Sequence, residues 1–84
     1  MTTLNRRYEL TSPFQYKGNV IRAILYYDGN SDLVHSWDVT VGTFNISKAA
    51  RYERLQRGFT DADLEALNRH VAGMVNAKEG RRLV

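Results

Sequence analysis

The sequence predicts an α+β fold, with a three-stranded antiparallel β-meander over about residues 6–41 and two α-helices over about 48–57 and 61–79. Two observations support this prediction. The first half contains β-rich runs that alternate between apolar and polar residues and are separated by turn residues. The second half contains an apolar stripe with helical spacing that follows a helix-start signal. A chain of 84 residues is expected to form one domain, 1–84, with a thin core.

The first predicted hairpin turns at Lys17 and Gly18, because glycine accepts a positive φ angle at no steric cost. Pairing Tyr16 with Asn19 across this turn places each large apolar residue of the first strand opposite an apolar residue of the second. The predicted pairs are Phe14 with Ile21, Leu10 with Leu25 and Tyr8 with Tyr27, with Pro13 opposite Arg22. In this register the apolar side chains of the first strand all face the core.

The second predicted hairpin turns over 28–30, which is Asp-Gly-Asn. Pairing Tyr27 with Leu33 defines its register. The predicted pairs are Leu25 with His35, Ala23 with Trp37 and Ile21 with Val39. Both hairpins therefore select the same core-facing residues on the central strand, which are Ile21, Ala23, Leu25 and Tyr27.

The opposite face of the predicted sheet is mixed in character. Arg22 is expected across from Asp38, where the two would form an exposed ion pair worth about 0–1 kcal/mol. A small apolar island is expected beside them, formed by Ile24, Tyr26 and Val34.

Two helices follow the predicted sheet. Ser47 is expected to cap the first helix, and Gly58 to end it. Thr60 is expected to be the N-cap of the second helix, with Asp63 at the capping-box position, and Gly80 to lie at its end. The second helix should cover the core face of the sheet with one apolar stripe: Leu64, Leu67, Val71, Met74 and Val75.

The first helix carries basic residues at every third position: Lys48, Arg51, Arg54 and Arg57. Three-residue spacing places them on one side of a helix, where they could recognise phosphates or an acidic protein surface. Arginine at most of these positions favours bidentate contacts. A solvated helix face explains the same row equally well, with Glu53 and Arg57 at ion-pairing distance along the helix.

The sequence favours neither catalysis nor metal binding. It has no cysteine and only two histidines, His35 and His70. His35 and Asp38 are three residues apart along a strand and so point to opposite faces, and His70 has no acid or nucleophile near it in sequence. His35 is interpreted as a core-edge residue, His70 as a solvated helix residue and Trp37 as a core residue. We therefore expect no enzyme, no cofactor and no metal.

Nucleic-acid and membrane motifs are also weak. A helix-turn-helix would present its second helix to the DNA, but that helix begins with Asp61, Asp63 and Glu65, which would repel phosphate. Only Tyr26 is a clear candidate for stacking on RNA. The longest apolar run, 23–27, is too short to span a membrane, and residues 1–10 lack the apolar segment of a signal peptide. A cytoplasmic protein without membrane contact is expected.

Three functions remain open, and the first is preferred. A non-enzymatic interaction protein would dock on a protein or nucleoprotein partner through the basic row or through the face that carries Arg22, Ile24, Tyr26 and Val34. In size and class the chain looks like small proteins of phages and mobile elements, some of which inhibit host machinery such as CRISPR complexes. The alternatives are a nucleic-acid-binding protein that contacts phosphates and a self-associating structural protein, such as a homodimer.

Overall fold

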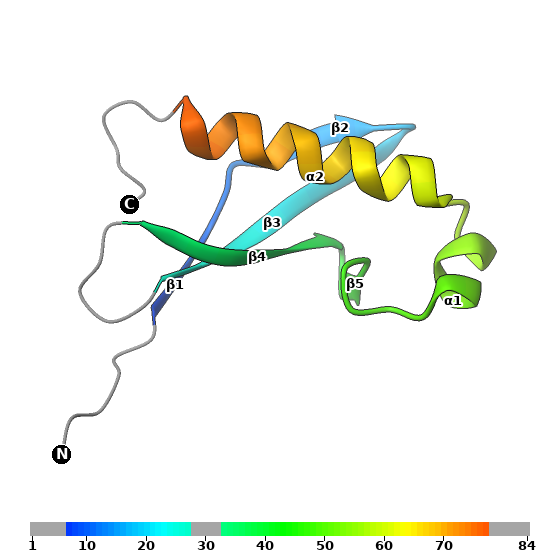
Figure 1. The fold of residues 1–84 in the computed structure, drawn as a ribbon. Helices are drawn as coiled ribbons and strands as arrows, with labels where there is room; N and C mark the ends of the chain where they lie inside the picture. The colour runs from blue at the N-terminus through cyan, green and yellow to red at the C-terminus, as the bar shows by residue number, and fades with distance from the viewer. Residues whose placement is uncertain (1–6, 28–32, 78–84) are drawn as a thin grey trace, which may run out of the picture.

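The computed structural model describes residues 7–27 and 33–77 and has an α+β fold, as predicted (Figure 1). An antiparallel sheet of five strands precedes two helices, so the class is confirmed and the strand count is higher than expected. The elements are β1 (Arg7–Leu10), β2 (Phe14–Tyr16), β3 (Asn19–Tyr27), β4 (Val34–Val41), β5 (Phe44–Asn45), α1 (Arg51–Gln56) and α2 (Asp61–Asn76).

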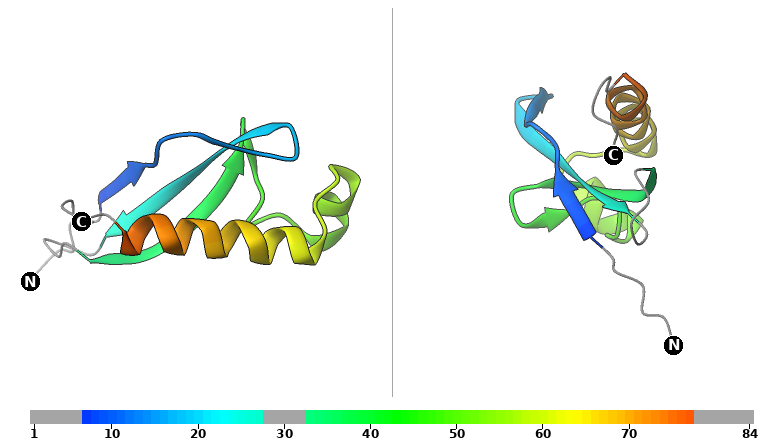
Figure 2. Two further views of the ribbon diagram at one scale, coloured as in Figure 1. Left: turned by 90° about the horizontal axis from the view of Figure 1, so that it is seen from above. Right: turned by 90° about the vertical axis from the view of Figure 1, so that its left-hand side faces the viewer.

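The central strand of the sheet is β3. It pairs with β1 and β2 along one edge and with β4 along the other, and β5 extends the sheet beyond β4. The two views in Figure 2 show α2 along one side of the sheet and α1 at the end of the molecule. One face of the sheet is therefore covered by α2, and the opposite face, called the outer face below, is not.

The core lies between the sheet and α2. The predicted core-facing residues of β3 are all buried: Ile21 and Ala23 are 0% exposed, Leu25 is 5% and Tyr27 is 2%. The other buried apolar residues are Val39, Ile46, Phe59, Leu67 and Val71. Each fully buried aliphatic or aromatic side chain contributes about 1.5–3 kcal/mol relative to an exposed one. The period-two pattern of β3 and the helical stripe of α2 thus meet in one cluster, as the sequence predicts.

The first hairpin has the predicted turn. Lys17 and Gly18 have φ angles of 51° and 78°, which is the pattern of a type I′ turn. Tyr16 pairs with Asn19, and Phe14 pairs with Ile21. The predicted register is therefore confirmed for β2.

The predicted first strand is broken into β1 and β2 by residues 11–13. Leu10 pairs with Ile24 and Phe14 pairs with Ile21, so these three residues lie opposite only two residues of β3, 22 and 23. The backbone N–H of Thr11 donates to the carbonyl oxygen of Ala23 at 2.9 Å, and the N–H of Ala23 donates to Thr11 Oγ1 at 3.0 Å. The extra residue thus lies after Thr11, at 12–13. Pro13 has no N–H to donate, and it lies between β1 and β2 instead of in a paired strand.

This extra residue reverses the faces of β1. Leu10 pairs with Ile24 and Tyr8 pairs with Tyr26, so the predicted pairs with Leu25 and Tyr27 are wrong. The partner of Leu25 is instead Glu9. A shift of one residue moves every side chain of a strand to the other face. The outer face therefore receives the apolar side chains of β1, and the core face receives its charged ones.

The register between β3 and β4 also differs from the prediction. Leu25 pairs with Trp37, Ala23 with Val39 and Ile21 with Val41, which is two residues from the predicted register in each case. A shift of two residues preserves the face, so Trp37 and Val39 still face the core. The expected turn at 28–30 lies outside the described residues.

An irregularity at Tyr26 and Tyr27 changes the face of Val34. Tyr26 pairs with Ser36 and Tyr27 with Val34, so β4 has one extra residue, His35, at this point of the register. Val34 therefore packs against the core and not on the outer face, and His35 is exposed instead of lying at the core edge.

The two helices begin and end close to the predicted positions. α1 begins at Arg51 after Ala50, not after Ser47, because Ser47 Oγ accepts a hydrogen bond from the N–H of Val39 at 2.8 Å. Gly58, with φ of 87°, follows α1 as predicted. The capping box of α2 is confirmed, and the expected end at residue 80 lies outside the described residues.

Candidate interaction surface

The outer face of the sheet carries an apolar patch that is larger than the predicted island. We define the outer apolar patch as Tyr8, Leu10, Ile24 and Tyr26. Because directly paired residues lie on the same face, the β1 register places the first two beside the last two. Tyr8 is 69% exposed and Leu10 is 48% exposed, whereas Ile24 and Tyr26 are half-buried. Sequence reasoning missed Tyr8 and Leu10 because it placed them in the core.

Arg22 lies at the margin of this patch. It pairs with Thr40, not with Asp38, so the predicted ion pair is wrong. The cause is the two-residue register difference between β3 and β4. Among residues 7–27 and 33–77, no acidic side chain forms an ion pair with Arg22, which is exposed two residues from Ile24.

Asp38 lies opposite Ile24 and is only 7% exposed. Its Oδ2 accepts a hydrogen bond from the Tyr26 hydroxyl at 3.0 Å and lies 3.5 Å from Lys48 Nζ. Burial, and then the hydrogen bond to Asp38, raise the pKa of the Tyr26 hydroxyl above its usual value. The Tyr26 hydroxyl is therefore a neutral hydrogen-bond donor to Asp38, and the side chain is half-buried.

The predicted row of basic residues finds partners within the chain. Lys48 lies outside α1 and contacts Asp38, as described above. Arg51 Nε is 3.1 Å from Asp61 Oδ2, and Arg54 Nη2 is 3.2 Å from Asp61 Oδ1. The guanidinium of Arg57 lies over the ring of Phe44, 4.1 Å from its centroid. The row is thus divided among internal contacts and does not form one continuous cationic edge.

Arg54 differs from its neighbour Arg51. The side chain of Arg54 is 12% exposed, whereas that of Arg51 is 71% exposed. Arg54 Nη1 also donates to the carbonyl oxygen of Ala49 at 2.9 Å, and its Nε is buried without a hydrogen-bond partner. Arg54 therefore fastens α1 to the segment before it and to the start of α2, which is a structural role.

A second apolar surface lies on α1. No residue of this helix is buried, and Tyr52 and Leu55 are 66% and 48% exposed. Their three-residue spacing places them on one side of the helix. Sequence reasoning missed this pair because it attended to the basic positions of the same helix.

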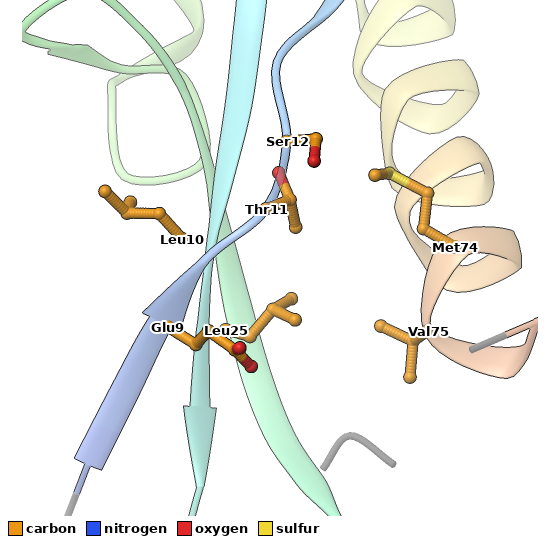
Figure 3. A pocket seen from close by; sticks show the side chains of 7 residues that line it. All are labelled: Glu9, Leu10, Thr11, Ser12, Leu25, Met74 and Val75. Carbon is orange, nitrogen blue, oxygen red and sulfur yellow. The ribbon is translucent and has the colours of Figure 1, made fainter. Parts of the chain in front are cut away.

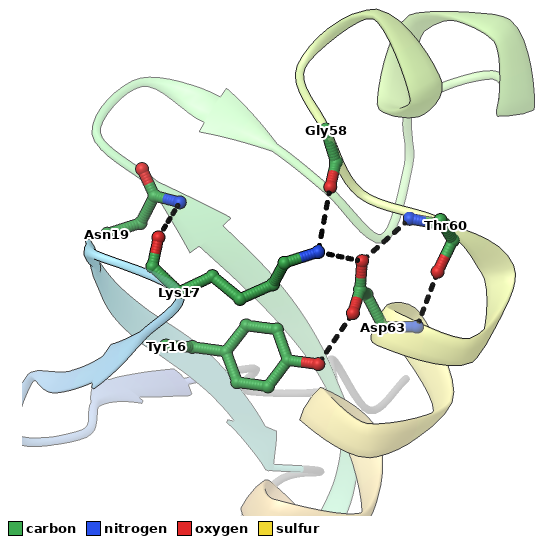
Figure 4. Close-up of polar contacts among 6 residues, drawn as sticks. All are labelled: Tyr16, Lys17, Asn19, Gly58, Thr60 and Asp63. Atoms are coloured by element: carbon green, nitrogen blue, oxygen red, sulfur yellow. Dashed lines mark hydrogen bonds and ion pairs between the residues drawn. The ribbon is translucent and has the colours of Figure 1, made fainter.

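A polar cluster joins the first hairpin to the start of α2 (Figure 4). Asp63 accepts hydrogen bonds from the Tyr16 hydroxyl at 2.6 Å, from Lys17 Nζ at 2.9 Å and from the N–H of Thr60 at 2.9 Å. Lys17 Nζ also donates to the carbonyl oxygen of Gly58 at 3.4 Å. The Tyr16 hydroxyl, followed by the Thr60 N–H and Lys17, holds the pKa of the Asp63 carboxyl well below its usual range.

The remaining candidates from the sequence do not converge on one site. The ring of His70 stacks at a tilt on Phe14, with 4.1 Å between centroids. Trp37 packs against the core, and its Nε1 donates to Asn68 Oδ1 at 3.1 Å. Over the described ranges, 7–27 and 33–77, no three His, Cys, Asp or Glu residues are grouped so as to hold a metal ion.

Comparisons with protein-family models, with curated proteins and with solved structures found no match to this chain. In the part of the chain that the structure describes, neither helix combines the length and the apolar character needed to cross a membrane. The function is therefore argued from the surfaces described above.

Proposed function

We propose that this chain is a non-enzymatic interaction protein that docks on a protein partner through the outer apolar patch. The observation that supports the proposal most is the register of β1, which places the exposed side chains of Tyr8 and Leu10 on the face of the sheet opposite α2. Contiguous exposed apolar surface on a small domain is typical of an interaction site. Exposed tyrosine is also enriched among residues that dominate binding energy.

The chemistry of the margin supports the same assignment. Arg22 adds an exposed positive charge beside Ile24, and Asp38 and Lys48 form a polar pair beside Tyr26. An apolar centre with a polar rim is the usual anatomy of a protein–protein interface. The basic row is a weaker docking site because Arg51, Arg54 and Lys48 already contact acidic side chains of this chain.

The test uses two matched pairs of variants in a pull-down from host lysate. Tyr8→Ser and Leu10→Ser change the outer apolar patch. Tyr52→Ser and Leu55→Ser are the matched variants on α1. The two tyrosines, Tyr8 and Tyr52, are 69% and 66% exposed, and the two leucines, Leu10 and Leu55, are both 48% exposed. Half of each lysate is treated with nuclease, and circular dichroism confirms that every variant is folded.

The proposal predicts a partner that survives nuclease, is retained by the two α1 variants and is lost with the two sheet variants. Loss with the α1 variants alone would move the interface to α1 and overturn the assignment. Loss with nuclease alone would favour the phosphate-binding alternative, whose affinity should fall steeply with salt.

A narrower form of the proposal is that the chain inhibits host machinery, such as a CRISPR complex, in the cytoplasm of a cell that carries a phage or mobile element. It is motivated by the small size of the chain and by its exposed apolar side chains. The identity of the captured partner tests it directly, because a partner outside such machinery would contradict it.

A further inference from the structure

We propose that the edge of β1 facing away from β3 binds an extended segment of the protein partner as an additional antiparallel strand. The segment carries apolar residues at two alternating positions and an acidic residue two positions before the first of them. This inference rests on the proposed function and specifies the chemistry of the partner at the outer apolar patch.

The edge of β1 is accessible. Within residues 7–27 and 33–77, β1 is an end strand of the sheet and pairs only with β3. All four of its residues are exposed. A cavity of about 250 Å³ separates β1 from the C-terminal half of α2, where Met74 and Val75 face the strand (Figure 3). An end strand with open backbone groups is a template for pairing with another chain.

The opposite edge of the sheet is partly covered by the chain itself. The short strand β5 pairs with the end of β4, and the N–H of Ile46 donates to the carbonyl oxygen of Val39 at 2.8 Å. The N–H of Val39 donates in turn to Ser47 Oγ. The β1 edge is therefore the better site for an added strand.

The ladder between β1 and β3 determines which backbone groups face this edge. The N–H of Thr11 donates to the carbonyl oxygen of Ala23, so these residues form a hydrogen-bonded pair. In an antiparallel ladder, such pairs alternate with pairs that exchange no hydrogen bonds. Leu10 and Tyr8 are one and three residues from Thr11, so their N–H and C=O groups point away from β3. An added strand can exchange hydrogen bonds with both residues.

The same two residues carry the exposed side chains of the outer apolar patch. Residues that pair directly across two strands share a face. The residues of the added strand opposite Leu10 and Tyr8 would therefore place their side chains on the outer face. Figure 3 shows the Leu10 side chain pointing away from α2, toward that face. Apolar residues at these two positions would pack against the patch and extend it.

Arg22 favours an acidic residue in the segment. Arg22 is exposed on the outer face, two residues along β3 from Ile24, the partner of Leu10. No acidic side chain of the described residues forms an ion pair with it. In an antiparallel strand, the residue two positions before the partner of Leu10 would lie beside the break at 11–13, on the side of Arg22. An acidic side chain there would be attracted to Arg22, and a basic one repelled.

The probe is the peptide acetyl-Glu-Thr-Val-Thr-Val-Thr-amide, titrated into the full chain. In the proposed register its two Val residues lie opposite Leu10 and Tyr8, and its Glu lies near Arg22. One modified peptide carries N-methyl groups on both Val residues, whose N–H groups would face β1. Its matched control carries them on the Thr after each Val, whose N–H groups would face away. A third peptide has Lys in place of Glu. The readouts are amide NMR shifts and hydrogen exchange.

The inference predicts that the unmodified peptide protects the Tyr8 and Leu10 amides from exchange. Methylation of the Val residues should weaken binding at least about tenfold more than methylation of the Thr residues, because it removes two backbone hydrogen bonds. The Lys peptide should bind up to about fivefold more weakly at low salt, and Arg22→Gln should remove this difference. Equal binding of the two methylated peptides, or no protection of these amides, would overturn strand addition. Equal binding of the Glu and Lys peptides would overturn the acidic preference.

The variant Leu10→Pro separates this inference from the proposed function in the pull-down. It removes an N–H that faces the open edge, leaves the ladder to β3 intact and keeps an apolar side chain. Strand addition predicts that Leu10→Pro loses the partner, as Leu10→Ser does, while circular dichroism shows a folded chain. Retention by Leu10→Pro with loss by Leu10→Ser would overturn strand addition and leave the outer apolar patch as the interface. Retention by both Tyr8→Ser and Leu10→Ser would overturn the proposed function itself.

A second copy of the chain is the other possible source of an added strand. Light scattering and hydrogen exchange without peptide test this source. A dimer whose Tyr8 and Leu10 amides are already protected would assign the edge to a second copy and overturn the choice of partner. A monomer whose Tyr8 and Leu10 amides exchange freely supports a segment from a different protein.

Discussion

Replacing Arg54 by alanine should destabilise the fold far more than replacing Arg51, although both side chains contact Asp61. The hydrogen bond from Arg54 to the Ala49 carbonyl involves a charged donor and is worth about 1.5–3 kcal/mol. The contact with the exposed Asp61 adds about 0–1 kcal/mol. The buried Nε has no partner, so removing it recovers part of the desolvation penalty. We expect a net loss of about 2 kcal/mol for Arg54→Ala.

Arg51→Ala removes only the ion pair of a side chain that is 71% exposed. We expect a loss of less than about 1 kcal/mol, because exposed pairs contribute little. Urea denaturation, followed by circular dichroism, gives the free energy of unfolding for each variant. Thermal midpoints should fall by about 4–8 °C for each kcal/mol in a domain of this size.

A third variant separates charge from packing. Arg54→Met keeps much of the side-chain volume without the buried charge, so it should lose less stability than Arg54→Ala. Equal losses for Arg51→Ala and Arg54→Ala would refute the assignment of a structural role to Arg54. The four residues of the basic row could then be interpreted again as one binding surface.

Two further predictions concern acid sensitivity and the glycines. The pKa of the Asp63 carboxyl is lowered in the folded state, so its contribution to stability is present above the usual carboxyl pKa of about 3.9 and is lost as the pH falls below that value. Asp63→Asn should therefore reduce the loss of unfolding free energy at acid pH, as measured by denaturation curves collected on both sides of that pKa. Gly73→Ala, in the exposed interior of α2, should stabilise the fold by about 0.5–1 kcal/mol. Gly58→Ala should destabilise it by about 1 kcal/mol, because φ is 87° at that position.

Each of these predictions has a control within the chain. Asp61→Asn should keep the acid loss, since Asp61 is 57% exposed and the Tyr16 and Lys17 contacts belong to Asp63. If Asp63→Asn retains the full acid loss, another group controls it. The two glycine variants control each other, because neither added Cβ meets an atom within 4 Å. A change of the same sign in both would contradict the argument from backbone conformation.

The parts of the fold predicted correctly depend on local patterns. The turn at Lys17 and Gly18, the Thr60–Asp63 capping box and the core face of β3 each follow from residues close together in sequence. The face of most of β4 was also correct despite the wrong register, because an even shift preserves the alternation.

The parts predicted wrongly depend on one added residue or on distant contacts. Tyr8, Leu10 and Phe14 are in phase as one uninterrupted strand, and nothing in that alternation reveals the break at 11–13. The hydrogen bond from the Ala23 N–H to Thr11 Oγ1 favours the break, but it becomes visible only in three dimensions. The ion pairs of Arg51 and Arg54 with Asp61 likewise depend on how the chain turns at Gly58.

The extra residue at 12–13 has a consequence for how relatives of this chain would be aligned and compared. A homologue that lacks one residue there would exchange the faces of its β1, so that residues matched to Tyr8 and Leu10 would face the core instead of the outer face. A gap of a single residue would then change which β1 side chains are exposed more than many substitutions elsewhere. In such a lineage the position matched to Glu9 would vary freely on the surface, while here it faces the core side.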